Sequence, residues 1–340
     1  MHVIIGIDPH KASHTAVVID GDETELCAKK VRATRRQVDE LIGWAEPFES
    51  RLWAIESAEG LGYLLSQQLV AAGECVVDVP ATLAARSRVL ATGKSSKTDP
   101  NDALSVAVTA LRHGGLRRVR VAGHSEVLRL LAKRNTDLGN QRSRVVSRTH
   151  ALLAELSPGG IAKEINASDV DAFLEGFEPA TPSEHVRFDL VVELLDDVRR
   201  LDDQLKASKK KIRVAVEASG TTVTDVFGVG PIIAAMVIGY SGDIARFASR
   251  DHYAAYNGTA PIEYSSGGRT VRRLSQRGNR KLNHAIHMAA ISQLRQPHSD
   301  GRAYFDRRVA EGKTNKEAIR ALKRHISNAI YRHLVADTKR

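Results

Sequence analysis

The sequence predicts an α/β domain, a long helical middle region and a mainly helical C-terminal domain. Short apolar runs alternate with segments of helical spacing near the start, which is typical of a mixed sheet covered by helices. Two later segments repeat apolar residues at heptad positions, and the last segment combines glycine-proline turns with apolar helices. We therefore expect domains over residues 1–120, 121–220 and 221–340.

The first domain is predicted to open with three antiparallel strands, the last two of which are joined by a turn at Gly21-Asp22. Helices and strands then alternate, and Pro80 ends the last strand. The expected strands are 2–8, 14–20, 25–33, 52–57 and 75–80, and the expected helices are 35–45 and 60–72.

The middle region is predicted to form two long helices. Heptad positions are filled by Leu131, Leu138, Val145 and Leu152, and then by Val191, Leu194, Val198, Leu201, Leu205 and Ile212, with a gap at Ser208. Residues 158–185, rich in proline, are expected to be a loop-rich connection. A hairpin within one chain and a coiled coil between chains explain the pattern equally well.

In the C-terminal domain, Gly228-x-Gly230-Pro231 precedes an apolar helix, which is the layout of a helix-hairpin-helix element. Backbone N–H groups at such a helix start can hold a DNA phosphate. A tight turn before a helix is also common structure without any ligand.

Composition favours a globular, cytoplasmic protein. Hydrophobic residues make up 42% and charged residues 26%. No apolar run reaches the roughly 18 residues that a membrane span needs, and the first residues lack a signal-peptide pattern. Two cysteines, Cys27 and Cys75, exclude a disulfide framework and a four-cysteine zinc site.

Positive charge is concentrated in two separate segments. Residues 86–148 carry 14 basic against 4 acidic residues, and residues 220–340 carry 20 against 9, within a total net charge of +10. Such segments attract nucleic acid. An acidic segment, residues 1–85, lies before the first of them.

Four carboxylates mark a candidate metal site. Asp8 and Glu56 each end an apolar strand, and Asp99 and Asp102 lie three residues apart at the start of a helix. A two-metal site for Mg²⁺ or Mn²⁺ needs several such hard oxygen ligands. Alternatively, Asp99 is the N-cap of a helix with Pro100 at N1, and Asp102 at N3 only favours the helix dipole.

A serine on a turn is a candidate nucleophile. Ser265 and Ser266 precede Gly267-Gly268, and a polar surface turn is the alternative interpretation. Basic side chains that are expected to neutralise nucleic-acid phosphates follow it: Arg269, Arg272, Arg273, Arg277, Arg280 and Lys281.

The motifs GIDPHK, AIES, KTDPNDA, FGVGP, GTAPIEYSSGG and RGNRKLNHAI, in this order, resemble the DEDD transposases of bacterial insertion sequences. The resemblance covers nearly the whole chain except residues 158–185. It implies a RuvC-like N-terminal domain with the RNase H fold and a C-terminal domain that bears the serine. Asp8, Glu56, Asp99 and Asp102 match the family's acids, and Ser266 matches its nucleophile, although Ser265 leaves a one-residue ambiguity.

The resemblance further implies serine attack on a DNA phosphodiester, a covalent protein–DNA intermediate, and strand exchange. It also implies a noncoding guide RNA and a homo-oligomer, a dimer or tetramer, in which acids and serine come from different subunits. A RuvC-like nuclease that uses water and a non-catalytic nucleic-acid-binding protein remain alternatives. A sugar kinase is excluded because PHKASH offers no glycine-rich phosphate loop. His10 and His14 lack further zinc ligands and are expected to be polar surface residues.

Overall fold

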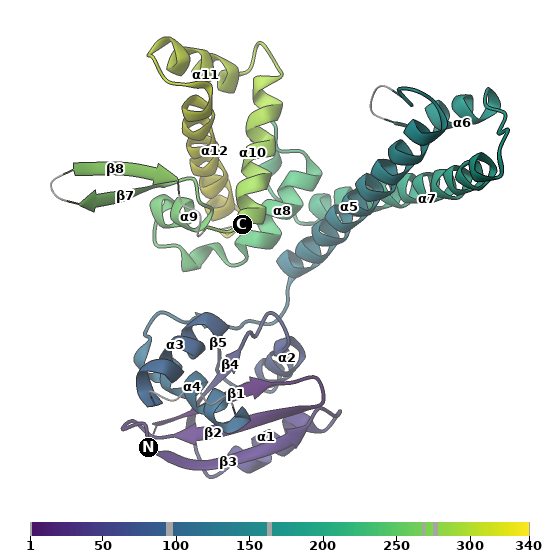
Figure 1. Cartoon of the computed structure of the whole chain (residues 1–340). Helices are drawn as coiled ribbons and strands as arrows, with labels where there is room; N and C mark the ends of the chain where they lie inside the picture. The colour runs from purple at the N-terminus through teal and green to yellow at the C-terminus, as the bar shows by residue number, and fades with distance from the viewer. Residues whose placement is uncertain (1, 93–97, 162–164, 267–268, 275–277, 340) are drawn as a thin grey trace. The chain divides into compact units, whose positions relative to one another are not determined.

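The computed structural model describes residues 2–92, 98–161, 165–266, 269–274 and 278–339, and it divides into two compact units. The first unit is Met1–Ala122 and the second is Gly123–Arg340 (Figure 1). The expected helical middle region belongs to the second unit. Among the described residues, no helix is both long and apolar enough to cross a membrane.

The first unit contains a mixed six-stranded sheet in the order β3-β2-β1-β4-β5-β6. The strands are β1 (His2–Pro9), β2 (Ser13–Ile19), β3 (Glu25–Arg32), β4 (Ser50–Glu56), β5 (Val76–Val79) and β6 (Arg117–Arg118). β1, β2 and β3 pair antiparallel, whereas β4 runs parallel to both β1 and β5. The predicted antiparallel start and the alternation that follows are confirmed. The short strand β6, antiparallel to β5, was not predicted.

Helices cover both faces of this sheet. α1 (Gln37–Ala45) and α2 (Tyr63–Ala71) pack on one face, whereas α3 (Ala81–Thr92) and α4 (Asp99–Arg112) pack on the other. Odd-numbered residues of β1 such as Ile5 face α1 and α2, while Ile4 faces α4, because side chains alternate along a strand. Asp8, an even-numbered residue, therefore lies on the α4 face.

The contact between β1 and α4 depends on Gly6. A Cβ atom at this position would lie 2.5 Å from the Ala107 backbone nitrogen and 2.7 Å from the Ala107 Cβ. A side chain would push α4 away from the sheet. Because Gly6 and Asp8 point to the same face of β1, this close approach also brings Asp8 near the first turn of α4.

The start of α4 differs by one residue from the expectation. Thr98 is the N-cap, with extended φ and ψ of −132° and 146°, so Asp99 is the first helical residue, Pro100 the second and Asp102 the fourth. The assignment of Asp99 as N-cap with Pro100 at N1 is wrong. Proline is tolerated there because the early N–H groups of a helix have no intrahelical acceptor.

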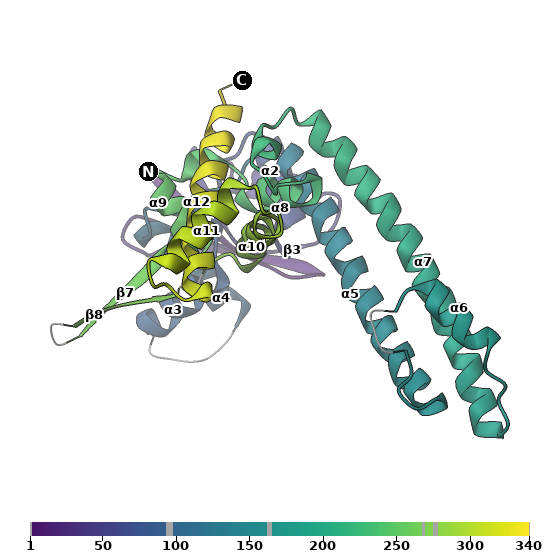
Figure 2. The same cartoon turned by 90° about the horizontal axis from the view of Figure 1, so that it is seen from above.

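The second unit contains a long antiparallel hairpin of α5 (His124–Leu156) and α7 (Pro182–Ala218), which lie side by side in both views (Figures 1 and 2). Ion pairs of Arg142 with Asp202 and of Arg187 with Glu155 link the two helices. The buried residues of α7 include Val191, Val198, Leu201 and Ile212, and Ser208 is buried at the heptad gap. A hairpin within one chain thus accounts for the apolar repeat.

The connection between these helices is more ordered than the proline content predicted. It contains α6 (Ala167–Glu175), and α7 begins at Pro182 rather than after residue 185. Thr181 and Glu184 form a capping box around Pro182. The sequence TPSE carries this signal, because serine or threonine followed three residues later by glutamate starts helices and proline suits the first turn.

The rest of the second unit is mainly helical, as predicted. Its helices are α8 (Pro231–Ser241), α9 (Arg250–Tyr256), α10 (Arg280–Leu294), α11 (Asp300–Ala310) and α12 (Asn315–Asp337), with short 3₁₀ turns η1 (Val223–Asp225) and η2 (Ile244–Arg246). Leu128 of α5 and Ile212 of α7 lie in their common core, so the long hairpin is rooted there.

A two-stranded antiparallel hairpin, β7 (Pro261–Ser266) and β8 (Arg269–Leu274), was not predicted. Only an open turn was expected in this segment. PIEYSS and RTVRRL lack a regular apolar alternation, which is the usual signal for a strand packed on a core.

Candidate metal centre

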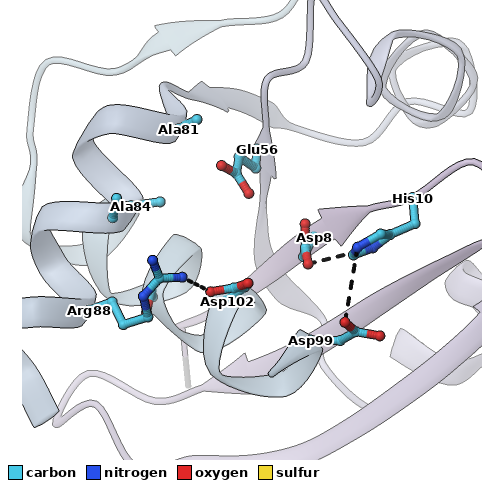
Figure 3. A pocket seen from close by; sticks show the side chains of 10 residues that line it. Asp8, His10, Glu56, Ala81, Ala84, Arg88, Asp99 and Asp102 are labelled. Atoms are coloured by element: carbon cyan, nitrogen blue, oxygen red, sulfur yellow. Dashed lines mark hydrogen bonds and ion pairs between the residues drawn. The ribbon is translucent and has the colours of Figure 1, made fainter. Parts of the chain in front are cut away.

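The four predicted carboxylates line one pocket of about 390 Å³ (Figure 3). Asp8 and Glu56 come from neighbouring parallel strands whose preceding residues, Ile7 and Ile55, are in register. Asp99 and Asp102 come from the first turns of α4. The pocket therefore forms where two strands end beside the start of a helix.

One subset has atoms close enough to share an ion. Ligand atoms of Asp8, His10 and Asp99 all lie within 4.8 Å of one another. His10 Nδ1 lies 3.6 Å from Asp8 Oδ2, and His10 Nε2 lies 4.0 Å from Asp99 Oδ1. Carboxylate oxygens suit Mg²⁺ and Mn²⁺, and an imidazole nitrogen suits a transition metal. This donor set fits a divalent cation.

The electrostatics of Asp8 agree with that fit. Burial raises the pKa of the Asp8 carboxyl, and the charges of Asp102 and Asp99 raise it further. His10 and a hydrogen bond with Glu56 act in the opposite direction and do not outweigh burial. A cation bound among these carboxylates would relieve both the desolvation and the repulsion.

Two cationic side chains pair with the two carboxylates of α4. Lys30 Nζ donates to Asp99 Oδ2 at 2.9 Å, and this hydrogen bond lowers the pKa of the Asp99 carboxyl. Arg88 of α3 pairs with Asp102 (Figure 3). The pocket thus supplies counter-ions to part of its own negative charge.

His10, Lys30 and Arg88 were not predicted to belong to this pocket. His10 was assigned to the surface; it is half exposed, but its ring faces Asp8 and Asp99. The surface role for His14 is wrong, because His14 is buried and its Nε2 lies 2.9 Å from Gln37 Oε1. A usable signal was the closeness of His10 to Asp8 in the sequence, directly after the end of β1. Lys30 and Arg88 gave no local signal.

The residues assigned to nucleic-acid binding lie in the second unit. Ser266 is the last residue of β7 and pairs with Arg269, the first residue of β8. Arg272 and Arg273 follow in β8, while Arg277 lies outside the described residues. Arg280 and Lys281 start α10.

The two glycines before α8 have different surroundings. Gly228 has a φ of +84°, and a Cβ there would lie 2.7 Å from the carbonyl oxygen of Ala289, so packing on α10 already requires a glycine. Gly230 is the N-cap of α8 and faces open space.

Two family models match the chain. A DEDD transposase model matches residues 5–158, and a model described as the IS116/IS110/IS902 transposase family matches residues 220–306. The chain is 27% identical to an uncharacterized 44.8 kDa protein of insertion element IS116 from Streptomyces clavuligerus, over 94% of this chain and 91% of the relative. It is 26% identical to a protein of IS900 from Mycobacterium paratuberculosis, over 96% and 94%.

A probable family 20 transposase from Pseudomonas aeruginosa is 26% identical over 82% of this chain and 80% of the relative. Among solved structures, RuvC from T. thermophilus in complex with a Holliday junction substrate is 18% identical and covers 35% of this chain and 100% of RuvC, with a TM-score of 0.29. The two family matches and the nearly full-length relatives agree with each other. The chain belongs to the IS110/IS116 family of DEDD transposases, enzymes that act on DNA.

Proposed function

We propose that this transposase cuts and rejoins the DNA strands of an insertion sequence through a covalent serine–DNA intermediate. The observation that carries the proposal is the gathering of Asp8, Glu56, Asp99 and Asp102 around one pocket in a chain of this family. Those residues would hold Mg²⁺ or Mn²⁺, which when bound would polarise the phosphodiester.

The residues of the pocket would then have different roles. Asp8 and Glu56, fixed on adjacent strands, would provide rigid oxygen ligands. Asp99 and Asp102 would exchange the cations Lys30 and Arg88 for the metal. The released Arg88 guanidinium would then be able to bind a phosphate oxygen of the DNA in the same pocket.

The proposed nucleophile is the Ser266 hydroxyl, with Ser265 as the alternative. Ser266 ends β7, so it would be offered at the end of a hairpin rather than within a core. Its oxygen would attack phosphorus and displace a DNA oxygen, which keeps the phosphoester available for rejoining. The acidic pocket belongs to the first unit and the hairpin to the second, so acids and serine would meet within one chain or between subunits.

A noncoding guide RNA and a homo-oligomer, a dimer or tetramer, complete the proposal. Support for the RNA comes from the family resemblance and from the two basic segments, which offer more than one surface to nucleic acid. Copurification of RNA from a locus that includes the noncoding flanks, and light scattering of the purified complex, would test these two points.

The nucleophile is tested by trapping the intermediate on a nicked DNA substrate. We expect a DNA-shifted protein band whose phosphoserine maps to residues 264–269. Ser266→Ala should abolish the band, and Ser265→Ala should retain it. The reverse pattern would move the assignment to Ser265. Normal cutting and joining by both variants would exclude serine chemistry.

A water-using nuclease of the RuvC kind is the second candidate. It is favoured by the fact that all four carboxylates lie in the first unit, so that the pocket needs no residue of the second. It predicts free DNA ends and no covalent product in the same trapping experiment. A non-catalytic nucleic-acid-binding protein predicts neither product.

A further inference from the structure

A group of cationic side chains lies where α10 packs against α12. Arg280 is the first residue of α10, whereas Arg320 and Lys323 lie three residues apart on α12 and so share one face. Lys323 Nζ donates a hydrogen bond of 2.7 Å to Asn283 Oδ1 of α10. This bond fixes the half-buried ammonium between the two helices.

Within the described part of the chain, neither Arg280 nor Lys323 has a carboxylate within ion-pair distance. The hydrogen-bond partner of Lys323 is a neutral amide. Asp251, which α9 directs toward α12, pairs with Arg324 instead. Glu317 acts on Arg320, but its carboxylate also accepts the hydrogen bonds of the Thr314 cap. The group therefore keeps a net positive charge that attracts an external anion.

This group is linked to the end of α9, which directly precedes the segment that leads into the β7–β8 hairpin. Asn283 Nδ2 donates to the carbonyl of Asn257 at 2.8 Å, and the Asn279 N–H donates to the carbonyl of Tyr256 at 2.7 Å. Asn257 is fully buried and its side chain donates to Ser327 Oγ of α12. The same polar network thus holds the end of α9 together with α10 and α12.

We propose that Arg280, Arg320 and Lys323 form a binding site for a backbone phosphate of nucleic acid at the base of this hairpin. The inference rests on the proposed function in one respect, that the hairpin acts on a nucleic-acid strand. The start of α10 adds the positive end of a helix dipole beside Arg280. The site would hold the strand close to the hairpin that carries Ser266.

The protonation of Lys323 offers a way to observe the site. Burial and the charges of Arg280 and Arg320 lower the pKa of Lys323 to about 8. His287 of α10 also faces it, and burial and the Lys323 charge lower the pKa of that imidazole. A phosphate would raise the pKa of Lys323. The bound state then holds more protons, so affinity should fall as pH rises through about 8.

The test is fluorescence anisotropy of the full-length protein with labelled DNA and RNA duplexes of one sequence, in chelator, between about pH 7 and about pH 9. We expect the wild-type Kd to rise several-fold over this range. Lys323→Arg should bind over the whole range with the affinity that the wild type has at the lower pH, and so lose the pH dependence. Lys323→Gln should bind several-fold more weakly at the lower pH, with a salt slope reduced by about one.

Lys206→Gln, which removes an equal charge from an exposed position of α7, is the matched control and should keep the pH dependence. A response with DNA alone or with RNA alone identifies which strand supplies the phosphate. The proposal is overturned if Lys323→Gln binds like the control, or if Lys323→Arg keeps the wild-type pH dependence. Because no covalent product is needed, failure of the serine mechanism would leave this result readable.

Discussion

The acidic pocket of the first unit and the basic group of the second unit handle their charges in opposite ways. In the pocket, Asp99 pairs with Lys30 and Asp102 pairs with Arg88, so part of the charge is balanced from within. In the basic group, Arg280 and Lys323 have no ion-pair partner among the described residues. A site with its own counter-ions can fold before its metal arrives, whereas unpaired cations are stabilised only by an anion from outside.

The largest effect is expected when a carboxylate of the acidic pocket is replaced. Asp8→Asn should reduce recombination by about a thousandfold or more, because a buried oxygen ligand for the metal is lost. Nucleic-acid binding by the second unit should be unchanged. Recombination assays measure the first effect, and fluorescence anisotropy measures the second. Asp22→Asn, at an exposed turn, is the control, and near-normal recombination by Asp8→Asn would exclude the proposed ligand role.

The same variant tests the pKa of Asp8. Because burial raises this pKa in the folded state, the stability contributed by protonated Asp8 is fully present below its ordinary value of 3.8 and is lost as pH rises through the raised value. Without metal, Asp8→Asn should lack this loss and melt at a higher temperature than the wild type at neutral pH. Thermal unfolding in chelator measures it; a lower Tm would contradict the assignment of burial as the main cause.

A second test of the acidic pocket displaces α4, which carries two of its carboxylates. Gly6→Ala should destabilise the first unit by about 3 kcal/mol, because the new methyl group meets the backbone of α4. Metal binding should weaken as Asp8 and Asp102 separate, and the second unit should unfold as before. Calorimetry can compare it with Gly21→Ala, where an added Cβ has nothing within 4 Å. Equal stability of the two variants would mean that α4 does not depend on this contact.

Removing an internal counter-ion of the acidic pocket tests whether it competes with the metal. Arg88→Gln should bind Mn²⁺ about tenfold more tightly, because the metal no longer competes with the guanidinium for Asp102. Titration calorimetry measures this, with the exposed Arg86→Gln as control. If Arg88→Gln binds the metal less tightly, the guanidinium supports the site rather than competing for it.

The smallest expected effect lies far from both charged sites. Thr181→Ala removes the side chain that accepts from the Glu184 N–H and should cost about 1 kcal/mol at the start of α7. Hydrogen exchange should show faster opening near α6, while metal affinity and DNA affinity stay the same. Thr181→Ser should restore the protection. A change in metal affinity would show that the hairpin is coupled to the first unit.

Features that depend on residues close together in the sequence were predicted, whereas features that depend on distant residues were not. Asp8 and Glu56 were predicted to lie together because each ends an apolar run, and α4 was predicted to within one residue of its start from local residues. Arg88 and Lys30 were missed because their partners are 14 and 69 residues away and are chosen by helix and sheet packing. α3 was missed because no apolar stripe marks it after Pro80.

The same distinction holds in the second unit. The apolar repeat predicted α5 and α7, but it did not decide whether they pair within one chain. In the structure, buried residues of both helices share apolar clusters within one chain, and two ion pairs add to this contact. The β7–β8 hairpin and the Lys323 group were missed. The Lys323 group depends on the buried Asn257 network, whose members lie between 26 and 70 residues apart, and the hairpin strands lack the regular apolar alternation that predicts a strand.

The length of the α5–α7 hairpin sets the distance between α6 and the helical core of the second unit, and this length can be changed. Its two ends have separate apolar clusters, one around Leu128 and Ile212 in the core and one around Leu153 and Val191 near α6. Between them the helices repeat one packing pattern. Deleting seven residues from each helix would bring α6 about 10 Å closer to the core and keep the remaining side chains facing the same partners. A relative could therefore lengthen or shorten this arm in steps of two helical turns without redesigning either end.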